Sequence, residues 1–265
     1  MARPPPRSPD AVPWGWAGAG AVLGLLLALL LYAPARWLAA GLARASNGQV
    51  QLAEPRGTVW SGSARLLLTG GAGSRDAAAL PDRLEWRLRP ASSGLTLRLL
   101  ARCCMAEAWR LALTPHWSGL RLRLADAHAR WPAALLQGLG TPWNTVRPEG
   151  ELALSTERLE IDWNAGRLTV SGGARLDAND IASRLSTLRP MGSYRVTLRG
   201  GAVPALQLET LPGSNLQLSG SGQWVGSRLR FEGSASAAPE RVDALSNLLN
   251  ILGRRDGTRS IIKVG

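Results

Sequence analysis

The side chains that could carry acid–base, nucleophilic or metal chemistry are few and scattered in this sequence. There are two histidines, His116 and His128, and neither has a cysteine or carboxylate at the spacing of metal ligands. Asp126 lies close to His128 where a strand is expected to end, and a solvated pair is the ordinary interpretation. The sequence has no nucleophile elbow and no glycine-rich loop of the phosphate-binding kind. We therefore expect no catalytic residue, no metal site and no cofactor, and predict that the protein is not an enzyme.

Two adjacent cysteines, Cys103 and Cys104, raise the question of redox chemistry. Neighbouring residues on a strand point to opposite faces, and a bond between them closes a strained ring. We therefore expect the pair to pack as ordinary side chains without a structural disulfide. An exported domain would still permit an intermolecular bond.

The charge balance limits the class of partner. The chain of 265 residues carries a formal net charge of +12, and Lys263 is its only lysine. Such an excess can indicate nucleic acid, an anionic membrane surface or an acidic partner, or a compositional bias toward arginine. Because the arginines alternate along expected strands and do not cluster on a helix or tail, the pattern argues against nucleic acid.

An apolar segment near the N-terminus predicts a membrane anchor. Residues 1–13 are proline-rich and are expected to form a cytoplasmic tail. The next 20 residues, 14–33, contain no charge, and a helix of that length covers about 30 Å of hydrocarbon. Aromatic side chains suited to the membrane interface bracket the segment: Trp14, Trp16, Tyr32 and Trp37. We predict a transmembrane helix over 14–33.

A cleavable signal peptide is the main alternative for this segment. The residues Ala33 to Ala35 have the small-x-small form of a cleavage site, but the apolar run is longer than a usual signal core of about 7 to 15 residues. We favour the retained anchor. Residues 34–47 then form a juxtamembrane helix or linker, in which Arg36, Trp37 and Arg44 suit lipid headgroups.

From residue 48 onward the apolar residues recur at every second position. This alternation is typical of antiparallel strands with one covered face and one wet face. It is clearest in five segments: Leu95 to Leu100, Leu120 to Ala125, Glu151 to Ser155, Leu206 to Leu211 and Asn215 to Trp224. The sequence therefore predicts a mainly β domain over 48–265.

One sequence device recurs along this domain. A tryptophan is followed by a small-residue turn and a new alternating strand at Trp60, Trp117, Trp163 and Trp224. The last two copies match at an offset of 61 residues, which also places Gly172 on Gly233. Each of these last two copies is expected to be a hairpin followed by a short helix, at 177–188 and at 238–252, in units of about 150–210 and 211–265. Stacked units predict an elongated, twisted antiparallel sheet in which the tryptophans fill the gaps between units.

The C-terminal segment is the most specific. It predicts an amphipathic helix over Pro239 to Leu252, closed by Gly253, then a final strand over Ser260 to Val264. Arg254 and Arg255 suit the negative end of that helix and are candidate partner-binding residues. The ending "LSNLLNILGRRDGTRSIIKVG", together with "GTVWSG" at Gly57 shortly after one apolar segment, resembles the type II secretion system protein N family, also called the general secretion pathway protein N family.

The resemblance implies a single-pass inner-membrane protein with its N-terminus in the cytoplasm and a periplasmic β-rich domain. It also implies a role with other secretion subunits in exporting folded proteins across the outer membrane, and no catalytic residues. Two functions remain open: a scaffold, or a lipid or amphiphile carrier that uses an open apolar sheet face. A periplasmic hydrolase would need an acid–base cluster that the sequence does not display. The sequence leaves the oligomeric state open. Six inward positions should separate the two functions, because helices cover them in a scaffold whereas they line an open groove in a lipid carrier: Leu97, Leu99, Leu122, Leu124, Leu168 and Val170.

Overall fold

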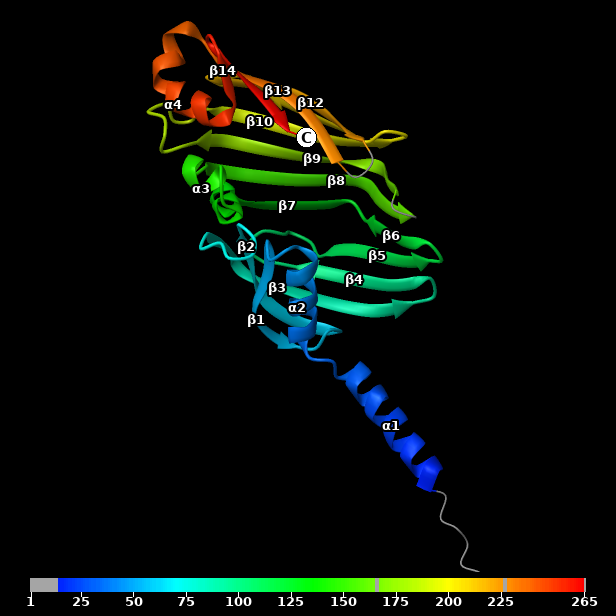
Figure 1. The fold of residues 1–265 in the computed structure, drawn as a ribbon. Coiled ribbons are helices and arrows are strands. Elements are labelled where there is room, and N and C mark those ends of the chain that lie inside the picture. The colour runs from blue at the N-terminus through cyan, green and yellow to red at the C-terminus, as the bar shows by residue number, and fades with distance from the viewer. Residues whose placement is uncertain (1–13, 165–166, 226–227, 265) are drawn as a thin grey trace, which may run out of the picture.

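A single antiparallel sheet of 15 strands makes up most of the protein (Figure 1). The computed structural model describes residues 14–164, 167–225 and 228–264, so the expected tail at 1–13 lies outside the described residues. The strands are β1 (Val50–Gly57), β2 (Ser61–Thr69), β3 (Ala77–Ala91), β4 (Gly94–Leu100), β5 (Trp109–His116), β6 (Gly119–Leu124), β7 (Ala127–Pro132), β8 (Glu149–Asn164), β9 (Arg167–Ala182), β10 (Gly192–Gly201), β11 (Ala205–Thr210), β12 (Leu216–Val225), β13 (Arg228–Ala237), β14 (Arg254–Asp256) and β15 (Arg259–Val264).

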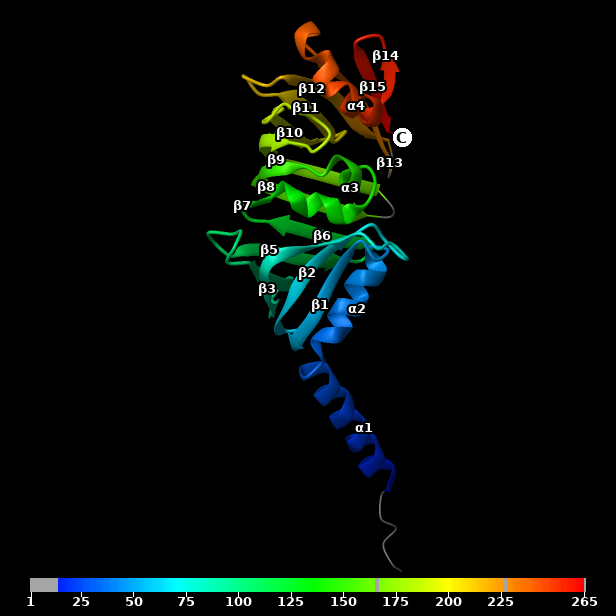
Figure 2. The same cartoon turned by 90° about the vertical axis from the view of Figure 1, so that its left-hand side faces the viewer.

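Strands that follow one another in the chain lie next to one another in the sheet with few exceptions. β8 pairs with β6 along one half and with β7 along the other, and β15 lies between β13 and β14. The helices are α1 (Trp14–Leu31), α2 (Ala35–Ala45), the 3-10 helix η1 (Ala133–Leu139), α3 (Trp143–Val146), the 3-10 helix η2 (Pro239–Arg241) and α4 (Val242–Leu252). Figures 1 and 2 show the strands stacked from β1 near α1 to β14, β15 and α4 at the opposite end. The predicted mainly β, antiparallel fold is confirmed.

Helix α1 covers most of the segment 14–33 that was predicted to cross the membrane. It ends at Leu31 after 18 residues, a length of roughly 27 Å at about 1.5 Å per residue. Within the described ranges, no helix has both the length and the apolar character needed to cross a membrane. The expected anchor residues are solvent-exposed, with exposed fractions of 78% for Trp14, 82% for Trp16, 75% for Tyr32 and 50% for Trp37.

Helix α2 lies within the segment 34–47 that was predicted to be a juxtamembrane helix or linker, but it packs on protein. Its Ala35 and Leu38 contact a buried cluster with Leu52 of β1, Ala64 of β2 and Trp86 of β3. The polar face, which carries Arg36, Trp37 and Arg44, is exposed. The β1–β2 turn is also tied to the N-terminal helices, because the Trp60 indole donates to the Leu30 carbonyl (2.7 Å).

The repeated tryptophan stretches lie at hairpin turns, as expected. Trp163 faces Leu168 across the β8–β9 hairpin, and Trp224 faces Leu229 across β12–β13, so residues 61 apart hold the same register. The expectation that these tryptophans fill gaps between units is wrong at two positions. Trp117 is 105% exposed and Trp163 62% exposed, because each lies at the outer tip of its hairpin.

The two glycines at the same offset have different local structures. Gly172 occupies a register shift between β8 and β9 with φ of +73°, where a side chain would collide with the carbonyl oxygen of Arg158. Gly233 faces Gly220 in a regular ladder. Only the first position therefore requires the conformational freedom of glycine.

One of the two expected helices is a strand. Residues 177–182 continue β9, where Ala178 pairs with both Leu152 and Tyr194, so two ladders override the helical spacing. Residues 184–188, the rest of that expected helix, form turns and bends. The other expected helix is present as η2 followed by α4, and β15 confirms the final strand. Gly253 follows α4 in an extended conformation and not in the left-handed one typical of a glycine cap.

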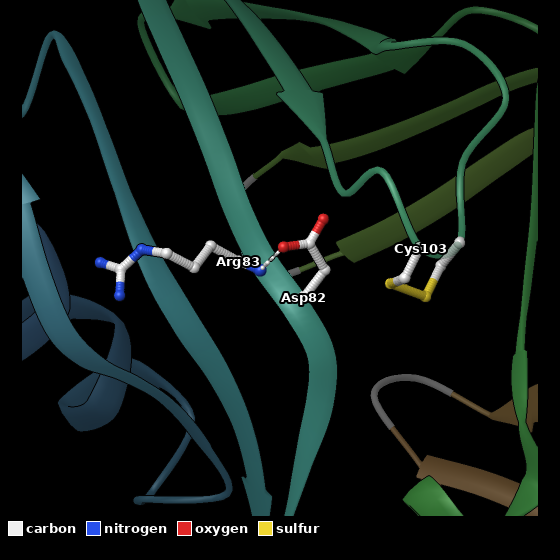
Figure 3. Close-up of a disulfide and its surroundings, with 4 residues drawn as sticks. Asp82, Arg83 and Cys103 are labelled. Atoms are coloured by element: carbon white, nitrogen blue, oxygen red, sulfur yellow. Dashed lines mark hydrogen bonds between the residues drawn. A yellow bond between two sulfur atoms is a disulfide. The ribbon is translucent and has the colours of Figure 1, made fainter.

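The adjacent cysteines also differ from expectation, because Cys103 and Cys104 are joined by a disulfide (Figure 3). They lie in the turn between β4 and β5 and not on a strand, so their side chains need not point to opposite faces. Backbone bonds hold this turn: the Ala101 carbonyl accepts from Cys104 (3.0 Å), and the Cys104 carbonyl accepts from Arg130 (2.8 Å). Neither cysteine is free.

Candidate functional site

The C-terminal half of the sheet has one apolar face and one charged face. On the apolar face Val196 of β10 pairs with Leu176 of β9 and Leu208 of β11. One residue along each strand, Arg195 pairs with Asp177 and Glu209 on the opposite face. The Arg195–Asp177 ion pair is 2.6 Å long, and the hydrogen bond that Arg195 donates to Asp177 raises the pKa of Arg195. The period of two thus separates an apolar surface from a solvated one.

A cavity of about 1270 Å³ lies on this apolar face. Its size exceeds that of most small-ligand pockets, which hold about 300 to 1,000 Å³. The lining residues come from the strands between β8 and β15 and from segments around η1, α3 and α4. The lining residues are Ala133, Leu136, Pro142, Trp143, Val146, Pro148, Leu152, Leu176, Ala178, Ile181, Met191, Tyr194, Val196, Leu208, Leu216, Leu218, Phe231, Leu248, Leu252, Gly253, Arg254, Arg255, Asp256, Ile261, Ile262 and Lys263.

Short helices build the wall opposite the strands. In α4 the residues Leu245, Leu248, Leu249 and Leu252 follow helical spacing, and the first three are at most 1% exposed. Leu248 and Leu252 reach the cavity, as does Trp143 of α3, which is 38% exposed. α3 and α4 lie along one side of the strand stack (Figure 2). The cavity therefore lies between the sheet and these helices, where the helices do not cover the apolar face completely.

The interior of the cavity has little polar character. Tyr194 places a hydroxyl among the apolar side chains, and that hydroxyl donates to the Leu216 carbonyl (3.2 Å). Burial raises the pKa of Tyr194, as expected for a phenol removed from water. A ligand in this part of the cavity would therefore meet mainly hydrocarbon.

The β14–β15 side of the cavity is basic. Among the described lining residues, Arg254, Arg255 and Lys263 are basic and Asp256 is acidic. Lys263 pairs with Glu232 of β13 (3.1 Å). Sequence reasoning selected Arg254 and Arg255 as partner-binding residues, and the structure places both at this cavity.

The six inward positions chosen to separate scaffold from carrier do not line the cavity. Leu97 and Leu99 pack in the cluster that α2 covers. Val170 is buried at 7% exposure, and Leu122, Leu124 and Leu168 are half-buried. The uncovered apolar surface is instead formed farther along the sheet. The alternation of Leu176 and Ala178 could have indicated this apolar surface. It was not recognised because the residues from 177 onward were predicted to be helical.

The candidate acid–base residues belong to surface ion pairs and turns. His116 lies 3.6 Å from Asp162, whose other oxygen accepts from Arg121 (2.6 Å) and raises the pKa of that arginine. Asp126 accepts from the Arg158 backbone (2.7 Å) and so supports the bulge of β8. Within residues 14–164, 167–225 and 228–264, no group of three or more histidine, cysteine or acidic side chains could hold a metal ion.

A second feature is an exposed apolar cluster at the hairpin tips, which we call the tip patch. It consists of Trp117 in the β5–β6 turn, Leu120 of β6 and Trp163 of β8; Leu120 is 44% exposed and pairs directly with Trp163. Large exposed aromatics of this kind are typical of protein contact surfaces.

Both edges of the sheet carry features that discourage strand addition. β1 contains Pro55 next to a register shift, with Glu54 at φ of +49°. β14 at the other edge is three charged residues long. Proline, bulges and short charged strands are ordinary protections of a sheet edge. The tip patch is therefore the better candidate for a protein contact.

A family model described as type II secretion system (T2SS), protein N, matches residues 48–262, which includes every strand except the last two residues of β15. The chain belongs to this family. Comparison with curated proteins and with solved structures gave no match.

Protein N is a component of type II secretion, an envelope-associated protein-transport system, and is not known as an enzyme. Membership implies interaction with other secretion subunits. The resemblance carried by the ending and by the Gly57 stretch is thus confirmed at the level of the family. The match begins at residue 48, so it covers the sheet and not α1 or α2.

Proposed function

We propose that this protein N acts as a scaffold subunit on the periplasmic side of the inner membrane and supports the export of folded proteins across the outer membrane. Family membership supports the process. Attachment through α1 is supported by its large apolar side chains, such as Leu23 (68% exposed) and Leu30 (58% exposed), which the rest of the described chain leaves uncovered. Lipid would remove these side chains from water.

The observation that carries the scaffold role is the tip patch. Trp117 and Trp163 expose two indoles on neighbouring hairpins, and burying such side chains against a partner contributes strongly to affinity. The surrounding charges are already matched, since Arg121 pairs with Asp162 and Arg123 pairs with Glu160 (2.6 Å each). A partner can therefore cover the indoles without leaving these charges unpaired.

The test replaces both indoles in cells that depend on this protein for secretion. Trp117→Ala with Trp163→Ala should leave the fold intact, because neither side chain is buried, and should cause exported proteins to accumulate in the periplasm. Val203→Ala is the control, since Val203 is 54% exposed at a different hairpin tip. A photo-crosslinker at position 117 should capture another secretion subunit. Normal secretion by the double variant at normal protein levels would refute this contact surface.

A second candidate function, binding of a lipid or other amphiphile, is favoured by the cavity. Its volume and hydrocarbon lining suit an apolar chain and would not suit a polar ligand. Native mass spectrometry of the full chain extracted in a mild detergent should show a reproducible bound lipid. Spectra free of lipid across several detergents would count against this function.

A further inference from the structure

The most unusual polar group at the cavity is the guanidinium of Arg255. Its Nε donates to the Gly257 carbonyl (2.7 Å), whereas Nη1 is buried and finds no acceptor among the described residues. A buried charged donor without a partner is costly. No ion pair of Arg254 or Arg255 is present in the described part of the chain either. The β14–β15 side of the cavity thus carries the positive charge of two guanidinium groups, with Nη1 of Arg255 itself enclosed by protein atoms.

The other lining residues restrict the class of ligand that the cavity could bind. A peptide would bring backbone amides that need partners, yet the described strand-side lining is hydrocarbon except for Tyr194, whose hydroxyl already donates to Leu216. An acyl chain brings no such groups. An anion linked to an acyl chain matches both parts of the cavity at once, since arginine binds phosphate oxygens well.

We propose that the cavity binds an anionic phospholipid, with its acyl chain against Leu176, Val196 and Leu208 and its phosphate against Arg255 and Arg254. This inference rests on the second candidate function above and specifies its ligand. Asp256 lies beside the two arginines and weakens the attraction for an anion, while Lys263 is already neutralised by Glu232. Arg255 is therefore the side chain whose loss should matter most.

The experiment uses the full chain in phosphatidylcholine nanodiscs. Lysophosphatidylglycerol and lysophosphatidylcholine of equal chain length, each with a photoactivatable group near the end of the chain, are added below the concentration at which they form micelles. After illumination the adducts are mapped by peptide mass spectrometry. We expect adducts on β10 to β12 with lysophosphatidylglycerol at about tenfold or greater excess over lysophosphatidylcholine, because the choline ammonium of the second lipid is repelled by the two arginines. Adducts on α1 report entry into the disc and serve as an internal standard.

Two pairs of variants test the two halves of the proposal. Arg255→Gln should reduce labelling by lysophosphatidylglycerol to the level of lysophosphatidylcholine, whereas Arg230→Gln, an exposed arginine of β13 away from the cavity, should not. Leu208→Trp should narrow the cavity at β11 and lower the labelling of β10 to β12 by both lipids. Gln207→Trp changes the exposed neighbour on the same strand and should leave labelling unchanged.

The outcomes separate the ligand class from the function itself. Equal labelling by the two lipids, or labelling that Arg255→Gln leaves unchanged, would overturn the anionic class while amphiphile binding stands. Cavity strands that stay unlabelled would overturn amphiphile binding as well. If Leu208→Trp lowers the thermal midpoint strongly, the arginine pair alone decides the proposal.

Discussion

Removal of one leucine from α4 should show how strongly this helix stabilises the C-terminal half of the sheet. Leu249 is fully buried, and its neighbours Leu245 and Leu248 are at most 1% exposed. Leu249→Ala deletes three carbon atoms, and at about 0.8 kcal/mol per buried methylene the lost transfer free energy is about 2.4 kcal/mol. Because the close-packed neighbours leave little room for collapse, the residual void should raise the total to about 4 kcal/mol.

The assay is urea unfolding of the full chain in one fixed detergent, followed by far-ultraviolet circular dichroism. Ile251→Ala is the matched control, because Ile251 lies on the same helix and is 38% exposed, so its loss should cost less than about 1 kcal/mol. The Leu249 site does not line the cavity, so its effect is separate from ligand binding. Similar unfolding midpoints for the two variants would refute the view that α4 is held by its buried leucine face.

Three further predictions follow from individual contacts. Gly172→Ala should destabilise the protein by more than about 3 kcal/mol, and Gly213→Ala, with φ of +84° but open space around it, by about 1 to 2 kcal/mol in the same urea assay. Burial raises the pKa of Tyr194, so its neutral form is favoured in the fold; stability should be complete below about pH 10 and fall above it by up to about 1.4 kcal/mol per pH unit, and Tyr194→Phe should reduce that slope. Alkylation of the denatured chain should find no reactive thiol before reduction and two after it, because Cys103 and Cys104 are bonded to each other.

Much of the strand pattern could be predicted because it depends on local alternation. The segments at 95–100, 120–125 and 206–211 coincide with β4, β6 and β11, and each buries one face against its neighbours. The helix over 239–252 was equally readable, since its leucines recur at helical spacing after a proline start. Where local preference and tertiary pairing agree, the sequence alone is enough to predict the strand or helix.

The failures have physical causes that a single sequence hides. Residues 177–182 carry helical spacing, but β8 and β10 on either side satisfy their backbone groups as a strand. Burial of Trp117 and Trp163 could not be judged because their surroundings depend on which hairpins reach beyond the sheet. The cavity was missed for a similar reason: its lining comes from elements more than a hundred residues apart, from Ala133 to Lys263.

The position of the cavity along the sheet bears on how a lipid could reach it. In the strand order six spacings separate β1 from β8 and eleven separate β1 from β13, and the Trp60–Leu30 hydrogen bond ties α1 to the β1 end. At about 4.8 Å per spacing, the cavity lies roughly 30 to 50 Å along the sheet from that end (Figure 1). With α1 in the inner membrane as proposed, a phospholipid bound in the cavity has left the bilayer entirely. The protein would then hold single lipid molecules delivered through water or by another subunit.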